Sequence, residues 1–239
     1  MVELELTISE VRDETSLIKG LRLQPQAGTR LPPFPPGAHL QVSVPGLSEV
    51  RCYSLITFDG ESFAAPSEYR LGVRLEAESS GGSRYMHSLK AGDTLKVKGP
   101  KNDFPLHHAP ADGAEAPLVL IAGGIGITPI AAMATALHAA GRPFMLHYSG
   151  RSRDQLAFLD ELQALLGDRL VIHCDDDPAS CLKLDALLAD LSTDQHIYIC
   201  GPKGMIDALI EATKTRGWAS DNIHFELFAA AAPQAGDQA

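Results

Sequence analysis

The chain has 239 residues, of which 45% are hydrophobic and 21% charged, values typical of a soluble globular protein with one large or two small domains. Its net charge of −10 argues against nucleic-acid and anionic-membrane binding, which need a basic surface. No apolar run approaches the roughly 20 residues of a membrane span. The start "MVELELTISE" lacks the regions of a signal peptide, so we expect a cytoplasmic protein.

The first domain, residues 1–106, is predicted to consist of strands. Apolar and polar residues alternate with a period of two in six stretches, which turns such as "LPPFPPG" and "AGD" separate. The stretches cover residues 2–11, 16–25, 38–46, 51–58, 69–77 and 94–100. This pattern predicts a six-stranded antiparallel barrel, with one short helix in "SRYMHSLK".

Two stretches of this barrel carry candidate ligand-binding residues. In "RCYS", the side chains suit a phosphate, a flat ring and a ring heteroatom, and the residues are Arg51, Tyr53 and Ser54. In "SSGGSRYMH", a helix opens in a way that suits an anion, and the residues are Gly82, Ser83 and Arg84. Taken alone, each stretch is more typical of an ordinary strand and a capped helix.

After residue 106 the pattern changes. Residues 107–117, "HHAPADGAEAP", are predicted to form a linker. Short apolar runs then alternate with helical segments, which predicts a five-stranded parallel α/β domain over residues 118–228. The runs cover residues 118–123, 144–150, 170–175, 196–201 and 222–228. Residues 229–239 are predicted to be a flexible tail.

The second domain opens on a glycine turn in "LVLIAGGIGITPIAAM". Gly124 and Gly126 give G-x-G, but Pro129 stands where G-x-G-x-x-G requires a third glycine. Thr128 is a good N-cap for the helix that follows, and Pro129 suits its first position. We therefore expect an anionic or electron-rich ligand at this turn, although glycine turns of purely structural use are common in α/β domains.

A second turn follows the strand that ends at Cys200, in "ICGPKGM", with Gly201 and Pro202 after it. Ligands of open α/β sheets bind beyond the carboxyl ends of the strands. Cys200 would then line the same crevice as the first glycine turn. Its alternative role is that of a small buried hydrophobe.

Taken together, "RCYSL", "GGSRYMH", "GPKNDFPL", "LIAGGIGITPI", "CGPKGM" and "FELF" resemble the ferredoxin–NADP reductase superfamily of flavoprotein reductases. The chain is most similar to its phthalate dioxygenase reductase and vanillate demethylase reductase group. The resemblance implies a flavin-binding barrel followed by a nicotinamide-binding α/β domain. It also implies FMN as the flavin and NADH as the donor. The stretch "HYSGRSR" carries Arg151 and Arg153 and no acid, which leaves NADPH open.

The resemblance also implies a role for each candidate residue. The FMN phosphate or ribityl chain would meet Arg51, Gly82, Ser83 and Arg84. The isoalloxazine would lie against Tyr53, Ser54 and, by stacking, Phe228, with Phe225 as the weaker candidate. The nicotinamide nucleotide would be held by Gly124, Gly126, Thr128, Cys200, Gly201 and Pro202. Its adenosine end would meet Ser149, Arg151 and Phe158.

By the same resemblance, hydride passes from NAD(P)H to FMN with Ser54 and Cys200 as the catalytic residues. Single electrons then leave for a separate ferredoxin or an oxygenase with a Rieske centre or haem. Relatives usually carry a plant-type ferredoxin domain, whereas this chain has no C-x₄-C-x₂-C and no C-x-x-C pair. We therefore expect the iron–sulfur cluster to lie on another protein or on a longer form of this chain, unless the flavin reduces a different acceptor directly.

Three alternatives stay open. A free-flavin reductase would bind FMN loosely as a substrate. A non-catalytic subunit would keep the fold and sense nucleotide. "CDDDP" at residues 174–178 could mark a metal site, but three adjacent acids after a strand are more typical of a solvated turn, and we expect no metal.

Overall fold

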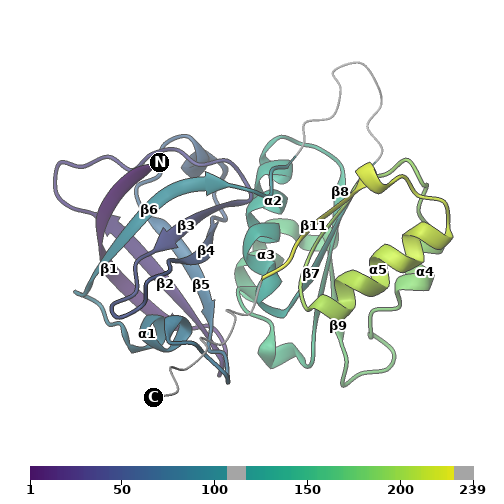
Figure 1. The fold of residues 1–239 in the computed structure, drawn as a ribbon. Helices are drawn as coiled ribbons and strands as arrows, with labels where there is room; N and C mark the ends of the chain where they lie inside the picture. Colours follow the sequence, from purple (N-terminus) through teal and green to yellow (C-terminus); the bar gives the residue numbers. More distant parts are fainter. Residues whose placement is uncertain (107–116, 229–239) are drawn as a thin grey trace.

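The computed structural model describes residues 1–106 and 117–228 (Figure 1). The expected linker, apart from Pro117, and the expected tail lie outside the described residues. A β-barrel and an α/β domain lie side by side (Figure 1). Within these residues, the helices are all too short or too polar to cross a membrane.

The N-terminal half is the barrel that the alternating pattern predicts. Its strands close in the order β1-β2-β5-β4-β3-β6, and every pairing is antiparallel. Alternate side chains such as Leu21, Leu23 and Leu71 fill the interior, and Met86 of the helix α1 joins them. The strands are β1 (Val2–Asp13), β2 (Ile18–Pro25), β3 (Ala38–Val42), β4 (Arg51–Ile56), β5 (Tyr69–Arg74) and β6 (Thr94–Asn102), and the helix is α1 (Gly82–Ser88).

The second half is the predicted five-stranded parallel sheet, in the order β11-β10-β7-β8-β9. The helices α2 and α3 cover the face toward the barrel, while α4 and α5 cover the other face. The strands are β7 (Leu118–Gly123), β8 (Phe144–Gly150), β9 (Leu170–Cys174), β10 (Ile197–Cys200) and β11 (Ile223–Glu226). The helices are α2 (Ile127–Ala139), α3 (Leu159–Leu166), α4 (Leu184–Ala189) and α5 (Lys203–Thr215).

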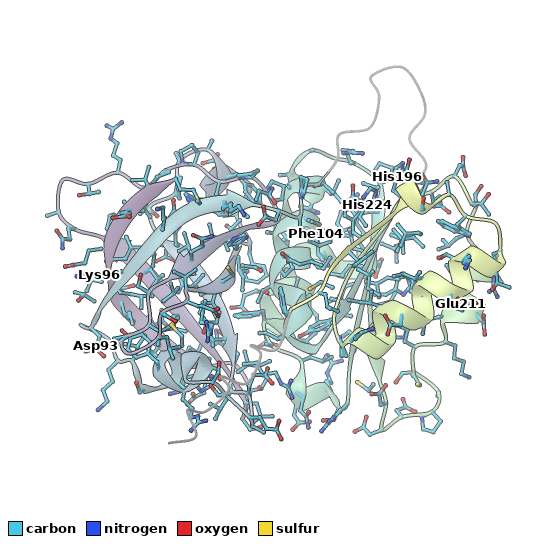
Figure 2. All side chains as sticks on the ribbon, in the orientation of Figure 1. Asp93, Lys96, Phe104, His196, Glu211 and His224 are labelled. Carbon is cyan, nitrogen blue, oxygen red and sulfur yellow. The ribbon has the colours of Figure 1, made fainter. Side chains whose placement is uncertain are left out.

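The helix α2 forms the contact between the two domains. It is buried on all sides from Ile127 to Thr135, because one face packs on the sheet and the other on the barrel. Its Thr135 hydroxyl donates a hydrogen bond of 2.8 Å to the carbonyl oxygen of Thr57 in the barrel. Phe104, which follows β6, lies with its ring 6.0 Å from that of Tyr198 on β10 (Figure 2). The domains therefore share one apolar core.

The start of α2 differs from the sequence-based expectation, and α3 begins after a residue with an unusual backbone. A turn of 3₁₀ helix at Gly124–Gly126 leads into α2, so Gly126 rather than Thr128 is the N-cap. The Thr128 hydroxyl instead donates to the carbonyl oxygen of Ile125 at 3.1 Å. The helix α3 begins only at Leu159, because Phe158 before it has a left-handed backbone with φ of 60°.

Candidate functional site

The candidate site lies where the two glycine turns of the sheet meet. Cys200 at the end of β10 pairs with Ala122 on β7 and with Glu226 on β11, so three strands end level with one another. A Cβ on Gly126 would lie 2.1 Å from the carbonyl oxygen of Cys200. A Cβ on Gly201 would lie 3.0 Å from the Cα of Gly123. Both glycines are therefore required for the two turns to touch.

Gly124 has a different environment. Its φ is +54°, and a Cβ there would meet nothing within 4 Å. It therefore faces open space beside the start of α2, where the expected ligand would lie. Thr128 is 1% exposed, and its hydroxyl is already bound to Ile125. In this structure Thr128 serves the turn rather than offering a hydroxyl to a ligand.

On the barrel side, two motifs thirty residues apart come together. The Arg51 Nη2 donates to Ser80 Oγ at 3.1 Å, and a Cβ on Gly82 would lie 2.8 Å from Arg51 Cγ. Arg51 is also 3.7 Å from the exposed carboxylate of Glu49. A guanidinium held between a serine and a glycine that leaves it room suits an anion. Sequence reasoning named Arg51 and Gly82 but missed Ser80.

The two neighbours of Gly82 hold their own loop. The backbone N–H of Glu76 donates to Ser83 Oγ at 3.1 Å. The Arg84 guanidinium donates to the carbonyl oxygen of Ser79. Both residues therefore shape the segment that carries Gly82, and the structure does not bring their side chains to Arg51.

The strand β4 presents the remaining barrel residues on alternate faces. Tyr53 packs partly against the barrel core, and burial raises the pKa of its phenol to about 12. Cys52, Ser54 and Ile56 share the other face, and Ile56 joins the core between the domains. Ser54 is 4% exposed, so its hydroxyl lies at the contact between the domains rather than in open solvent.

The sheet side carries an acid that sequence reasoning missed. Glu226, at the end of β11, has a buried Oε2 atom without a hydrogen-bond partner among the described residues. Burial, together with the nearby charge of Asp103, raises the pKa of Glu226 to about 7. "FELF" was considered only for its aromatic residues. A carboxylate at the carboxyl end of an otherwise apolar strand was the signal that could have identified it.

Cys200 is neighbour to this acid and is fully buried. Burial and the charge of Glu226 raise the pKa of its thiol well above the usual value, so it stays neutral. On the barrel, burial is the largest cause of the raised pKa of Cys52, and the charge of Glu226 adds to it. The part of β4 that carries Cys52 therefore lies near the end of β11 that carries Glu226.

The aromatic residues near the end of the described chain are accessible. Phe225 is 51% exposed and Phe228 is 42% exposed. Exposed large apolar side chains that lie close together are typical of a binding surface. Exposure alone does not favour either residue as the stacking partner, so the choice of Phe228 stays a prediction.

The end of β8 gains neighbours that the sequence did not indicate. Ser149 and the exposed Arg151 lie at this end. The backbone N–H groups of Asp175 and Asp176 donate to the carbonyl oxygens of Gly150 and Arg151, both at 3.0 Å. The acids of "CDDDP" therefore lie beside Arg151, and they are exposed. Within the described residues, no three His, Cys, Asp or Glu side chains are grouped to hold a metal ion.

Phe158 was expected to meet the adenosine end of the nucleotide. Its ring is only 2% exposed and belongs to the core between the domains. The adenosine contact stays a prediction, and it requires the ring to leave that core.

Comparison with known proteins decides the family. The chain is 41% identical to a vanillate O-demethylase oxidoreductase of Pseudomonas putida over 200 residues, covering 83% of this chain and 60% of the relative. It is 36% identical to the heme-dependent oxidative N-demethylase beta subunit of Ectopseudomonas mendocina, covering 96% and 71%. The structure of phthalate dioxygenase reductase matches with a TM-score of 0.82 and 34% identity, covering 98% and 70%. The chain belongs to the ferredoxin–NADP reductase superfamily, in its phthalate dioxygenase and vanillate demethylase reductase group.

A family model supports the same assignment for the second domain. Residues 108–223 match the N-terminal domain of the dimethylamine monooxygenase subunit DmmA-like family. The chain spans 60% of the Pseudomonas putida relative and about 70% of the other two proteins. The phthalate dioxygenase reductase structure is described as modular, with electron transfer from pyridine nucleotides to a [2Fe-2S] centre.

Proposed function

We propose that this chain is an NADH-dependent flavoprotein reductase that supplies electrons to a separate iron–sulfur protein or oxygenase. The observation that carries the proposal is a buried polar atom without a partner at the carboxyl end of the sheet. It is Oε2 of Glu226, and the charge of Glu226 acts on Cys52 of β4, the barrel strand that also carries Ser54. Groups of this kind are rare in folded proteins unless a ligand completes them.

A flavin ring fits these groups. Ser54 can donate a hydrogen bond to a ring heteroatom, and Glu226, with its pKa near 7, can either donate or accept one near neutral pH. Tyr53 stays a neutral phenol and adds a flat surface. Phe228 is exposed two residues after Glu226 and can cover the ring. The flavin, when bound, supplies the conversion of a two-electron donor into single electrons.

The barrel favours FMN as the flavin. Arg51 is held by Ser80 and by the room that Gly82 leaves, and one guanidinium suits a terminal phosphate. Extraction of the bound flavin and its identification by mass spectrometry test this choice. Recovery of FAD would overturn it.

The nicotinamide nucleotide fits the part of the site that belongs to the α/β domain. The helices α2 and α5 both start at the turns that touch there, and free N–H groups at helix starts suit a pyrophosphate. Gly124 leaves open space in front of α2. The neutral thiol of Cys200 and the adjacent Gly201 and Pro202 offer an uncharged surface for the nicotinamide. No residue here needs to act as a nucleophile.

The acidic loop supports NADH over NADPH. Asp175 and Asp176 are tied through their backbone to Gly150 and Arg151. Carboxylates at the end of the second strand accept hydrogen bonds from a ribose and repel a 2′-phosphate. We therefore propose that they offset the positive charge of Arg151, which the sequence alone left unopposed.

Anaerobic mixing with NADH tests the proposed function. The purified holoprotein should be yellow, and its visible flavin absorption should bleach with NADH faster than with NADPH. A protein that contains no flavin and binds none on titration would overturn the proposal. Flavin that separates during gel filtration and supports turnover only when added would favour a free-flavin reductase.

A further inference from the structure

An arginine outside the candidate site connects the two domains. Arg70 on β5 has a side chain only 10% exposed. Its Nη2 lies 2.7 Å from Glu161 of α3 and 3.2 Å from Glu14 of the turn between β1 and β2. Glu14 is itself 3% exposed. One guanidinium thus joins a buried carboxylate of the barrel to a carboxylate of the α/β domain.

The same guanidinium lies over two aromatic rings. Its central carbon is 4.8 Å from the centre of the Phe158 ring and 5.1 Å from that of Phe58. Phe58 follows β4 of the barrel, whereas Phe158 belongs to the α/β domain. Planar stacking of this kind is available to arginine and not to lysine.

Phe158 is held in an unusual conformation at this contact. Among the described residues it is the one non-glycine with a positive φ, at 60°, and its ring is 2% exposed. A conformation of this kind persists only where the surroundings enforce it. Phe158 directly precedes α3, which carries Glu161, so the contact fixes the start of that helix.

The contact continues into the nucleotide turn. A Cβ on Gly72, two residues after Arg70, would lie 2.9 Å from Phe158 Cε2 and 2.9 Å from Thr128 Cγ2. Thr128 stands in the first turn of α2, next to Gly126. The strand β5 therefore touches the segment that is proposed to hold the nicotinamide nucleotide.

The contact also reaches the part of the barrel where the flavin is proposed to bind. Arg70 pairs directly with Ile56 on the neighbouring strand β4, and Ser54 is two residues earlier on that strand. The paired strands β4 and β5 thus link these residues: β4 carries Ser54, and β5 lies against Phe158 and Thr128. Any rotation of the α/β domain on the barrel must break the contacts of Arg70.

We infer that Arg70 is a positioning residue. It sets how the barrel, with Ser54, is oriented relative to the sheet, with Cys200 and Glu226. This inference rests on the proposed function. A displacement of about 1 Å between reacting groups can slow a reaction by about a hundredfold. Arg70 touches no proposed ligand, so its effect on the reaction comes through domain orientation.

Arg70→Met tests the inference, with Arg22→Met as the matched control. Arg22 is also on the barrel, but its ion pairs with Glu10 and Glu68 stay within that domain. Amide hydrogen exchange on the apoprotein should rise at α3 and at the start of α2 in Arg70→Met, and not in Arg22→Met. This readout needs no flavin, so it separates failure of the inference from failure of the proposed function.

Flavin-loaded protein provides the second readout. In Arg70→Met, the rate of flavin bleaching by saturating NADH should fall about 10- to 100-fold, with flavin affinity changed less than about twofold. Arg70→Lys should recover only part of that rate, because it keeps the charge and loses the stacking. Unchanged exchange at α3 and α2, or an unchanged bleaching rate, would overturn the inference.

Loss of Arg70 leaves Glu14 buried without its cation, which can unfold the protein. The double variant Arg70→Met/Glu14→Gln removes that charge and keeps the test available. Phe158→Leu, which removes the stacked ring and leaves the ion pairs, should also slow bleaching. If the folded double variant and Phe158→Leu both react at the wild-type rate, domain orientation does not depend on this contact.

Discussion

Glu226 on β11 pairs directly with Cys200 on β10, so a carboxylate and a neutral thiol lie together at the carboxyl end of the sheet. Their surroundings raise the pKa of both groups. The thiol stays protonated at neutral pH, while the carboxylate titrates within the physiological range. Glu226 is therefore the residue of this site whose charge responds to pH.

Glu226→Gln should change the pH dependence of stability. The pKa of Glu226 is raised from 4.5 to about 7, so the folded apoprotein binds a proton that the unfolded chain has lost. Its contribution to the free energy of unfolding is present below pH 4.5 and is lost as pH rises to about 7. The variant should lack this decline. Above pH 7 its free energy of unfolding should exceed that of wild type by on the order of 2 kcal/mol, after allowance for partial exposure. Urea unfolding of the apoproteins across this pH range measures it, and parallel curves would contradict it.

Arg51→Ala should weaken FMN binding. The change removes a charge-assisted contact, worth about 1.5 to 3 kcal/mol, so the dissociation constant should rise about 10- to 100-fold. Fluorescence titration of the apoprotein with FMN measures the change. Arg22→Ala, on the same barrel and partly exposed, is the control and should bind as wild type does. Riboflavin, which has no phosphate, should bind both variants equally, and a loss of riboflavin binding in Arg51→Ala would refute the phosphate role.

Gly126→Ala should destabilise the α/β domain. Its Cβ would lie 2.1 Å from the Cys200 carbonyl oxygen, so the two turns would have to separate, at a cost of about 2 to 3 kcal/mol. Gly204→Ala is the matched control, because a Cβ there meets nothing within 4 Å. In the helix α5 it should add about 0.5 to 1 kcal/mol of stability. Thermal unfolding of both variants compares them, and equal melting temperatures would mean that the turns can part freely.

Asp175→Asn/Asp176→Asn should relax the choice of nucleotide. Removing two carboxylates beside Arg151 lowers the repulsion of a 2′-phosphate. The ratio of kcat/KM for NADPH to that for NADH should rise about tenfold, which corresponds to about 1.4 kcal/mol. Initial rates with each donor at low ionic strength measure the ratio, since salt screens exposed charges. A ratio that stays within about twofold of wild type would place specificity elsewhere.

The sequence was enough to predict the two-domain fold, because its signals are local. Alternation with a period of two depends on neighbours along the strand, and it marked all six barrel strands. Gly124 and Gly126 marked the turn before α2 for the same reason. The start of α2 was misplaced because Thr128 has N-cap chemistry, but its hydroxyl donates back to the carbonyl oxygen of Ile125 in the 3₁₀ turn that precedes the helix. The site residues drawn from the family resemblance stay predictions.

Tertiary structure decided which distant residues meet. The strand order placed β11 beside β10 and so made Glu226 the neighbour of Cys200, a pairing that depends on which strands are adjacent in the sheet. Barrel closure brought Ser80 to Arg51, and the β8–β9 pairing brought Asp176 to Arg151. Phe158 was expected to contact the adenosine of the nucleotide, but its ring packs between the domains. Burial there removes more apolar surface from water than a position at the nucleotide on the protein surface would. Burial and charge pairing depend on the whole fold, whereas turns and strand periods depend on a few adjacent residues.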